Sequence, residues 1–400
     1  MLNQKQSQAE PPTLSGQVSS ALLNNYSRYN VEFIRGKGAY LFDNSGREYL
    51  DFLSGIAVTG FGHSHPAILK DVKEQIENIW HTSNLFQSSG QEILAGKLAE
   101  QSGLGYVFFC NSGTEANEAA IKFVRKWGNG RSTIITALGG FHGRTFGSLS
   151  ASGQYKLWDG FFPLTPGFVY VPYDDFEAIE NSINHDTAAI MIEPIQGESG
   201  IIVPSDNYLK KLKEICDKNN LLLVVDEVQS GMGRTGKMFA HQWEEIKPDI
   251  ITLAKGIANG LPLGAVICAN EVAECITPGS HGSTFGGNPV AITAANSVID
   301  LLTEDQLAYI FIIGKKLKNE IRNIHHPLIK DVRGKGLMIG VEFNEPTNAK
   351  EVALKLLEEG VVVGTSGDRV IRILPPFIIT EEEITKFMLV FSSILNNLEG

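Results

Sequence analysis

The amino-acid sequence predicts an α/β protein with a large domain on a mostly parallel central sheet and a smaller α+β domain. Strand-like and helix-like segments alternate from about residue 106 to residue 300, as a parallel sheet with crossover helices requires. After residue 300 a long helical stretch is followed by short strands and a Gly-Asp turn, a pattern typical of an α+β unit. We expect an N-terminal arm and part of the small domain in residues 1–70, the large domain in 71–300, and the rest of the small domain in 301–400.

The first predicted strands lie in residues 29–55, where "AYLFDNSGREYLDF" alternates between apolar and polar residues. A two-stranded hairpin alone is marginally stable in water. We therefore expect this segment to pair with the C-terminal lobe, so that the small domain is built from both ends of the chain.

The strands predicted for the large domain are apolar on both faces, which is typical of buried parallel strands. They are "YVFFCN" (106–111), "TIITA" (133–137), "AAIMIEPI" (188–195), "LLLVVDEV" (221–228), "DIITLAK" (249–255) and "GAVICA" (264–269). Apolar residues at helical spacing predict helices in "TEANEAAIKFVRKW" and "DNYLKKLKEICDKN". The C-terminal lobe is expected to contain a long helix to about residue 324, strands in "VRGKGLMIGVEF" and "VVVGTSGDRVIRILPP", and helices in "NAKEVALKLLEEG" and at the end of the chain.

The overall composition favours an enzyme acting on small molecules. The formal net charge of −11 repels nucleic acid and anionic lipid, so neither is an expected partner. Most of the 41 glycines stand at strand-to-helix junctions, where backbone approaches ligands closely. The four cysteines form no C-x-x-C pair, which favours a reduced protein and no metal site.

The sequence shows no targeting signal. No apolar run approaches the roughly 18 residues of a membrane span, and the polar start "MLNQKQSQAEPPTLSG" has neither an apolar core nor an arginine. We expect a cytoplasmic protein, with an organelle matrix as the alternative.

Two neighbouring strand ends carry an acid and an amine. Asp226 ends one predicted strand, and Lys255 ends the strand that follows it in the chain. The carboxyl ends of parallel strands meet at one edge of the sheet, where α/β proteins bind ligands. A buried carboxylate needs a cationic or hydrogen-bonding partner, such as a ring N–H, and a partly desolvated lysine can form a Schiff base with an aldehyde.

A third feature lies at the start of the helix after residue 111. Ser112 and Glu115 form a capping-box pattern, and Gly113 lets backbone approach a ligand, as at a phosphate-binding helix N-terminus. Taken alone, each feature has an ordinary structural explanation: a plain helix cap or an ion pair. A phosphate site, a carboxylate for a ring nitrogen and an aldehyde-reactive amine together describe a site for pyridoxal 5′-phosphate.

The sequence resembles the class III aminotransferases of PLP fold type I, and most closely their acetylornithine-specific branch, from about residue 25 to residue 395. The motifs that carry the resemblance are "GIAVTGFGHSHP", "HTSNLF", "NSGTEANEAAIKFVR", "FHGRT", "EPIQGE", "DEVQSGMGRTG", "LAKGIANGLPLGA", "GSHGSTFGGNP" and "IRILPP". The resemblance implies that Lys255 binds the cofactor covalently and then moves protons, and that Asp226 keeps the pyridine nitrogen protonated.

The resemblance also implies the remaining cofactor contacts. Gly113 and Thr114 would hold the phosphate, Phe141 would stack on the ring, and Val228 and Gln229 would pack beneath it and contact its phenolic oxygen. By the same resemblance, Thr284 would reach the phosphate in the neighbouring subunit, which implies a homodimer with shared active sites.

For the substrate, the resemblance implies a switch between two amino donors. Arg372 in "IRILPP" would grip the α-carboxylate of glutamate, and Glu198 in "QGE" would neutralise that arginine when no such carboxylate is present. Arg144 would hold the distal carboxylate of either substrate by a bidentate pair, and Ser283 would touch the acylated substrate.

Several polar residues have a structural interpretation instead. His63 and His65 in "GHSHP" resemble a metal pair, but we expect hydrogen-bonded loop residues there. His142 is expected to shape the cofactor loop rather than to transfer protons. For Glu193, at a strand end before a proline, we expect a structural role.

The function implied is transfer of the terminal amino group of N2-acetylornithine to 2-oxoglutarate, giving N-acetylglutamate 5-semialdehyde and glutamate in arginine biosynthesis. Ornithine, N-succinylornithine, N-succinyl-diaminopimelate and 4-aminobutyrate are the alternative donors, and a non-catalytic dimeric scaffold is the alternative of another class. "SGIAVTG" lacks the tyrosine with which ornithine-specific relatives engage a free α-amino group, which favours an acylated donor. An intact lysine, acid and arginine argue against the scaffold.

Overall fold

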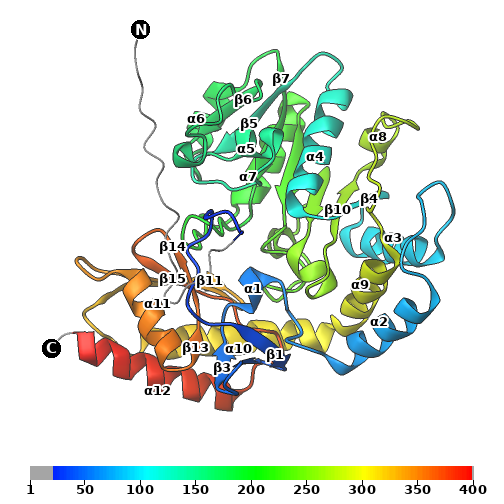
Figure 1. The fold of residues 1–400 in the computed structure, drawn as a ribbon. Coiled ribbons are helices and arrows are strands. Elements are labelled where there is room, and N and C mark those ends of the chain that lie inside the picture. The colour runs from blue at the N-terminus through cyan, green and yellow to red at the C-terminus, as the bar shows by residue number, and fades with distance from the viewer. Residues whose placement is uncertain (1–20, 399–400) are drawn as a thin grey trace, which may run out of the picture.

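A central sheet of seven strands organises the large part of the molecule in the computed structural model, which describes residues 21–398 (Figure 1). Its strand order is β4 (Tyr106–Cys110), β10 (Gly264–Cys268), β9 (Ile250–Leu253), β8 (Leu222–Asp226), β7 (Thr187–Ile192), β5 (Thr133–Ala137) and β6 (Phe168–Val171). Strands β6, β5, β7, β8 and β9 are parallel, whereas β10 is antiparallel to both of its neighbours. The predicted fold class is therefore confirmed. Strand β6 is the one the sequence did not predict.

Helices cover both faces of this sheet because its strands are apolar on both faces. Leu222 and Val224 of β8 pack in one buried cluster with α4 (Gly113–Trp127), while Leu223 and Val225 pack in another with α7 (Tyr208–Asn219). This alternation follows the two-residue period of a strand. The other helices around the sheet are α2 (Pro66–Asn78), α3 (Ser89–Ser102), α5 (Phe146–Ala151), α6 (Phe176–Ser182), α8 (Asn270–Ala273) and α9 (Pro289–Leu301), with 3-10 turns at Tyr155–Leu157, Ala240–Glu244 and Lys255–Ala258.

Two four-stranded sheets form the lower part of Figure 1. The first has the order β1 (Phe33–Lys37), β2 (Tyr40–Asp43), β3 (Glu48–Asp51) and β13 (Val361–Val362), and the second the order β11 (Ile329–Lys335), β12 (Met338–Phe343), β15 (Val370–Ile373) and β14 (Gly364–Ser366). They lie with α1 (Ser54–Ala57), α10 (Glu304–Arg322), α11 (Ala349–Glu358) and α12 (Glu381–Leu398). Because β3 pairs in parallel with β13, the predicted pairing of residues 29–55 with the C-terminal lobe is confirmed. The domain boundaries at residues 70 and 300 stay a prediction.

The described part of the chain contains no helix long and apolar enough to cross a membrane. Within residues 21–398, no group of three His, Cys, Asp or Glu side chains is placed to hold a metal ion. His63 instead lies with its Nε2 2.8 Å from Asp51 Oδ2, which is the hydrogen-bonded loop position expected for it. The predicted N-terminal arm lies mostly outside the described residues.

Candidate active site

The parallel pairing of β8 with β9 brings Asp226 and Lys255 to the same edge of the sheet. Asp226 is paired in register with Thr252, three residues before Lys255. Lys255 opens a 3-10 turn with a φ of 48°, a left-handed conformation that costs free energy for a residue with a side chain. The acid and the amine therefore lie at the same sheet edge, as predicted, and the backbone of Lys255 is strained.

A cavity of about 400 Å³ lies at this edge. Eight of the residues predicted for cofactor or substrate line it: Gly113, Thr114, Phe141, Arg144, Asp226, Val228, Gln229 and Lys255. Asn111, Ser112, Asn117, His142 and Glu193 also contribute to the wall. The strand ends and the N-terminus of α4 therefore converge on one concave site.

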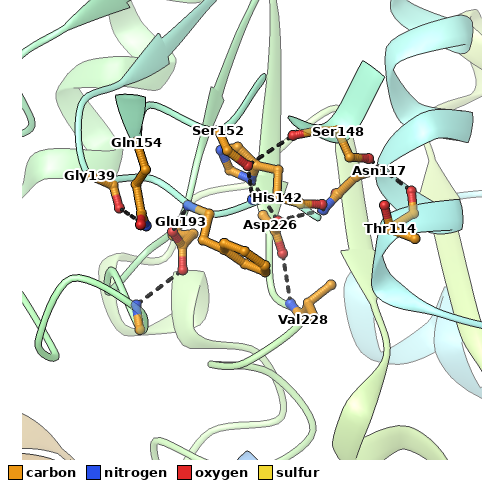
Figure 2. Close-up of polar contacts among 12 residues, drawn as sticks. Thr114, Asn117, Gly139, His142, Ser148, Ser152, Gln154, Glu193, Asp226 and Val228 are labelled. Carbon is orange, nitrogen blue, oxygen red and sulfur yellow. Dashed lines mark hydrogen bonds and ion pairs between the residues drawn. The ribbon is translucent and has the colours of Figure 1, made fainter. Parts of the chain in front are cut away.

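Asp226 is held from three sides (Figure 2). Its Oδ1 accepts a hydrogen bond from Val228 N at 3.0 Å. Its Oδ2 accepts one from Asn117 Nδ2 at 2.8 Å and lies 2.7 Å from His142 Nδ1. Desolvation lowers the pKa of His142, but the hydrogen bond and charge of Asp226 outweigh it and raise that pKa. Three partners therefore hold the Asp226 carboxylate in one orientation beside the cavity.

Asn117 is a site residue that the sequence analysis missed. Its Nδ2 also donates to His142 O at 2.7 Å, so one amide fixes both the acid and the loop beside it. The available signal was its position: Asn117 is a polar residue on the helical face that carries Ala120 and Val124, both fully buried. A buried polar side chain in an apolar stripe needs a hydrogen-bonding partner.

The N-terminus of α4 has the cap that was predicted, with one difference. Ser112 Oγ accepts from Glu115 N at 3.3 Å, but Glu115 Oε2 accepts from Asn111 N at 2.6 Å and from Ser112 Oγ at 3.2 Å rather than from the backbone N–H of Ser112. A Cβ on Gly113 would stand 2.8 Å from Val228 Cγ1. Glycine is therefore required there by the protein's own loop, which lies in van der Waals contact with the helix start.

The loop after β5 carries Phe141 and Arg144 to the cavity. Thr114 Oγ1 accepts hydrogen bonds from the backbone N–H groups of Arg144 and Thr145, each at 3.2 Å. The Arg144 guanidinium lies over the Phe141 ring, 5.6 Å from its centroid, a favourable cation–π geometry. Arg144 is exposed and so free to meet a carboxylate entering the site.

Arg372 and Glu198 form an ion pair just outside the cavity wall. Arg372 Nη1 donates to Glu198 Oε1 at 2.5 Å, and Gln229 Nε2, which lines the cavity, lies 3.4 Å from the same oxygen. Burial raises the pKa of Glu198, but the charge and hydrogen bond of Arg372 outweigh it and lower that pKa. The two residues predicted as a switch are thus in direct contact.

Lys255 is only partly exposed, and its Nζ makes no hydrogen bond among residues 21–398. Desolvation lowers the pKa of Lys255, against the opposing charges of Glu198, Asp226 and Glu193. A lowered pKa makes the neutral, nucleophilic amine more accessible near neutral pH.

Ser283 and Thr284 do not line the cavity. Ser283 Oγ accepts from Asn111 Nδ2 at 3.1 Å and from Gly286 N at 2.9 Å, and Thr284 is exposed on the surface. Asn111 lines the cavity, so Ser283 is one residue removed from it. The predicted substrate contact of Ser283 and cross-subunit contact of Thr284 stay predictions.

The residues present fit pyridoxal phosphate. The N-terminus of a 15-residue helix presents backbone N–H groups that suit an anion. The buried Asp226 faces the cavity as a partner for a ring N–H, and the Lys255 amine has no hydrogen-bond partner among residues 21–398. Gln229 also has a buried amide oxygen with no hydrogen-bond partner among the described residues. When bound, the cofactor supplies an aldehyde for amines and a protonated ring that accepts the electron pair left on carbon when a proton departs.

Comparison with known proteins agrees with this chemistry. The aminotransferase class-III family model matches residues 23–395. Acetylornithine aminotransferase of Bacillus cereus is 45% identical over 387 residues (94% of this chain and 98% of the relative), and that of Aquifex aeolicus is 45% identical over 379 residues (94% and 99%). Among solved structures, ornithine aminotransferase of Toxoplasma gondii superposes with a TM-score of 0.91 at 34% identity (95% of this chain, 93% of that one), and acetylornithine aminotransferase of Elizabethkingia anophelis with 0.84 at 33% (94% and 96%).

The fold and the site therefore define a pyridoxal-phosphate enzyme. Within that class, the chain belongs to the class-III aminotransferases.

Proposed function

We propose that the chain transfers the terminal amino group of N2-acetylornithine to 2-oxoglutarate, giving N-acetylglutamate 5-semialdehyde and glutamate. The observation that carries the proposal is the Arg372–Glu198 pair at the cavity edge, together with the second arginine, Arg144, in the cavity wall. The name acetylornithine aminotransferase on relatives 44–46% identical to the chain supports the same donor.

The ion pair suits an enzyme that must accept two different donors. Glutamate presents a carboxylate next to the carbon that reacts, whereas N2-acetylornithine presents only methylene groups there. Paired with Glu198, the Arg372 guanidinium offers no net charge to the acetylornithine chain. If Glu198 turns away, the same guanidinium can form a bidentate pair with the glutamate α-carboxylate. Glu198 keeps part of its side chain exposed, so it has room to move.

Each remaining site residue then has one task. Asp226, fixed by Asn117 and His142, holds the proton on the ring nitrogen of the cofactor. The neutral Nζ of Lys255 takes a proton from the substrate carbon and then delivers it to a carbon of the cofactor. Arg144 binds the distal carboxylate that both donors share, which orients the reacting amine toward Lys255.

The enzyme is proposed to act as a homodimer with shared active sites. The segments that contain residues 80–86 and 283–288 lie together, since Asn84 Nδ2 donates to the carbonyl groups of Ser283 and Gly286. They expose four large apolar side chains, those of Trp80, Leu85, Phe86 and Phe285. An apolar patch of this kind is typical of a subunit interface, and Thr284 stands within it.

We further propose a cytoplasmic enzyme of arginine biosynthesis. The place in arginine biosynthesis follows from the proposed donor, whose acylated α-amino group distinguishes it chemically from free ornithine.

A donor panel tests the proposal. Purified holoenzyme is given 2-oxoglutarate with N2-acetylornithine, ornithine, N-succinylornithine, N-succinyl-diaminopimelate or 4-aminobutyrate, and glutamate formation is followed by a coupled assay. We expect the highest kcat/KM with N2-acetylornithine. A higher value with ornithine or 4-aminobutyrate would replace the proposed donor, and no turnover with any donor would favour a scaffold.

A further inference from the structure

Glu193, just beyond β7, forms a bridge between two loops of the site (Figure 2). Its Oε1 accepts a hydrogen bond from Phe141 N at 2.9 Å, and its Oε2 accepts one from Gly197 N at 3.1 Å. Phe141 belongs to the loop after β5, and Gly197 immediately precedes Glu198. The side chain is 7% exposed, so water cannot readily replace either bond.

Two other side chains join the same loops, but at different positions. Gln196 Nε2 donates to Leu138 O at 2.9 Å, and Ser199 Oγ donates to Gly139 O at 2.5 Å. Both bonds hold the beginning of the first loop. Among the described residues, only Glu193 accepts hydrogen bonds both from the backbone N–H of Phe141 and from the backbone N–H of Gly197, beside Glu198.

We propose that Glu193 is a positioning residue that fixes Phe141, which stacks on the cofactor, relative to Glu198, which pairs with Arg372. The inference rests on the roles proposed above for Phe141 and Glu198. Glu193 hydrogen-bonds to backbone N–H groups on both loops, so it acts through Phe141 and Glu198 rather than on the reacting atoms.

The chemistry of the bridge requires a carboxylate. Two backbone N–H groups need two acceptor oxygens at the end of one side chain, and an ionised carboxylate has them, whereas an amide has one oxygen and one NH₂ group. The charged groups around the side chain are His142, Asp226 and Lys255, and the titratable Tyr173 also lies near it. Burial raises the pKa of Glu193 to about 7, with His142 opposing and Asp226 adding to the shift. At pH 8, above this pKa, the ionised form that accepts both bonds is favoured.

The test compares Glu193→Gln with Asp249→Asn. Asp249 is a matched control because it is 8% exposed and its Oδ2 accepts a backbone hydrogen bond from Leu223 N at 2.7 Å. It lies at the opposite end of the strands, beside Lys213 rather than beside the cavity. Both holoenzymes are examined at pH 8 by thermal unfolding, by the visible absorbance of the bound cofactor, and by single-turnover rates with glutamate and with N2-acetylornithine.

We expect Glu193→Gln to shift the absorbance and to lower the ratio of the N2-acetylornithine rate to the glutamate rate about tenfold, since one buried N–H loses its acceptor beside Glu198. Asp249→Asn should lower the unfolding temperature and leave the absorbance and the ratio unchanged. Glu193→Asp, which keeps the charge but shortens the side chain, should move both site readouts in the same direction and provides the test if the glutamine variant does not fold.

Unchanged absorbance and an unchanged rate ratio in both Glu193 variants would overturn the proposal, as would equal changes in Asp249→Asn. A wild-type enzyme that reacts with glutamate but not with N2-acetylornithine would overturn the proposed donor instead. In that case the absorbance and the rate ratio, measured with whichever terminal amine the wild type accepts, decide the role of Glu193.

Discussion

At the scale of single residues, the site depends on two groups, Asp226 and Lys255, that differ in how many hydrogen-bonding partners they have. Asp226 has three hydrogen-bonding partners, whereas the Lys255 Nζ has none in the described part of the chain. An acid with three hydrogen-bonding partners is held in one orientation. An unsatisfied amine is available for reaction with an aldehyde.

Replacement of Lys255 by alanine should abolish most of the activity. Without the amine, no group is present to attach the cofactor covalently or to take the proton from the substrate carbon. Turnover should therefore fall by several orders of magnitude. Steady-state assays at saturating 2-oxoglutarate measure the loss, and thermal unfolding confirms that the variant is folded. Turnover close to that of the wild type would place the reacting amine elsewhere.

The Arg372–Glu198 pair gives a second prediction at this scale. Glu198→Ala should leave Arg372 free for α-carboxylates, so that the half-reaction with glutamate is maintained while the one with N2-acetylornithine weakens, because an unpaired guanidinium then faces methylene groups. Arg372→Ala should mainly harm the glutamate half-reaction. Single-turnover spectroscopy follows each half-reaction. Equal losses for both donors in both variants would show that the pair is structural.

At the scale of elements, strands that are apolar on both faces were predictable, because their sequence reads as a continuous apolar run. Strand β6 was not, since "FVYV" has only one fully buried residue and lies at the sheet edge. The capping residues Ser112 and Glu115 were also predictable from spacing. The contacts that fix Asp226 were not, because Asn117 and His142 come from different elements and meet only after folding.

The close approach of α4 to the loop after β8 gives a prediction at this scale. In Gly113→Ala, the new Cβ would stand 2.8 Å from Val228 Cγ1, so the helix N-terminus or the loop must move. We expect weaker binding of pyridoxal phosphate, measured by titration of the cofactor-free protein, with about tenfold loss for a displacement worth roughly 1–2 kcal/mol.

Gly96→Ala is the control for that variant. Gly96 lies within α3, and a Cβ there would meet nothing within 4 Å. This substitution should raise the free energy of unfolding by roughly 0.5–1 kcal/mol, because alanine favours a helix interior, without a change in cofactor affinity. If both variants bound the cofactor like the wild type, the helix start would not form the phosphate site.

At the scale of the whole molecule, one folded chain accounts for the positions of most, but not all, of the predicted site residues. The cavity brings together eight predicted residues, but Thr284 remains on the surface and Ser283 bonds to Asn111 instead of facing the cavity. Spacing along the chain could predict which residues share a strand edge. It carries no information on which of them act on a second subunit, because that depends on the surfaces that the folded chain exposes.

The apolar patch of Trp80, Leu85, Phe86 and Phe285 gives the prediction at this scale. The Phe285 side chain is 62% exposed, which costs hydrophobic free energy unless another surface covers it. We expect the wild type to sediment as a dimer and Phe285→Glu to dissociate at micromolar concentration, since burial of an unpaired carboxylate in the interface is unfavourable. If Thr284 completes the partner's phosphate site, the monomeric variant should also bind pyridoxal phosphate more weakly.

Leu389→Glu, at a side chain 69% exposed on α12, is the matched control and should remain dimeric with normal affinity. A monomeric wild type with full activity, or a dimeric Phe285→Glu, would show that this patch is not the interface.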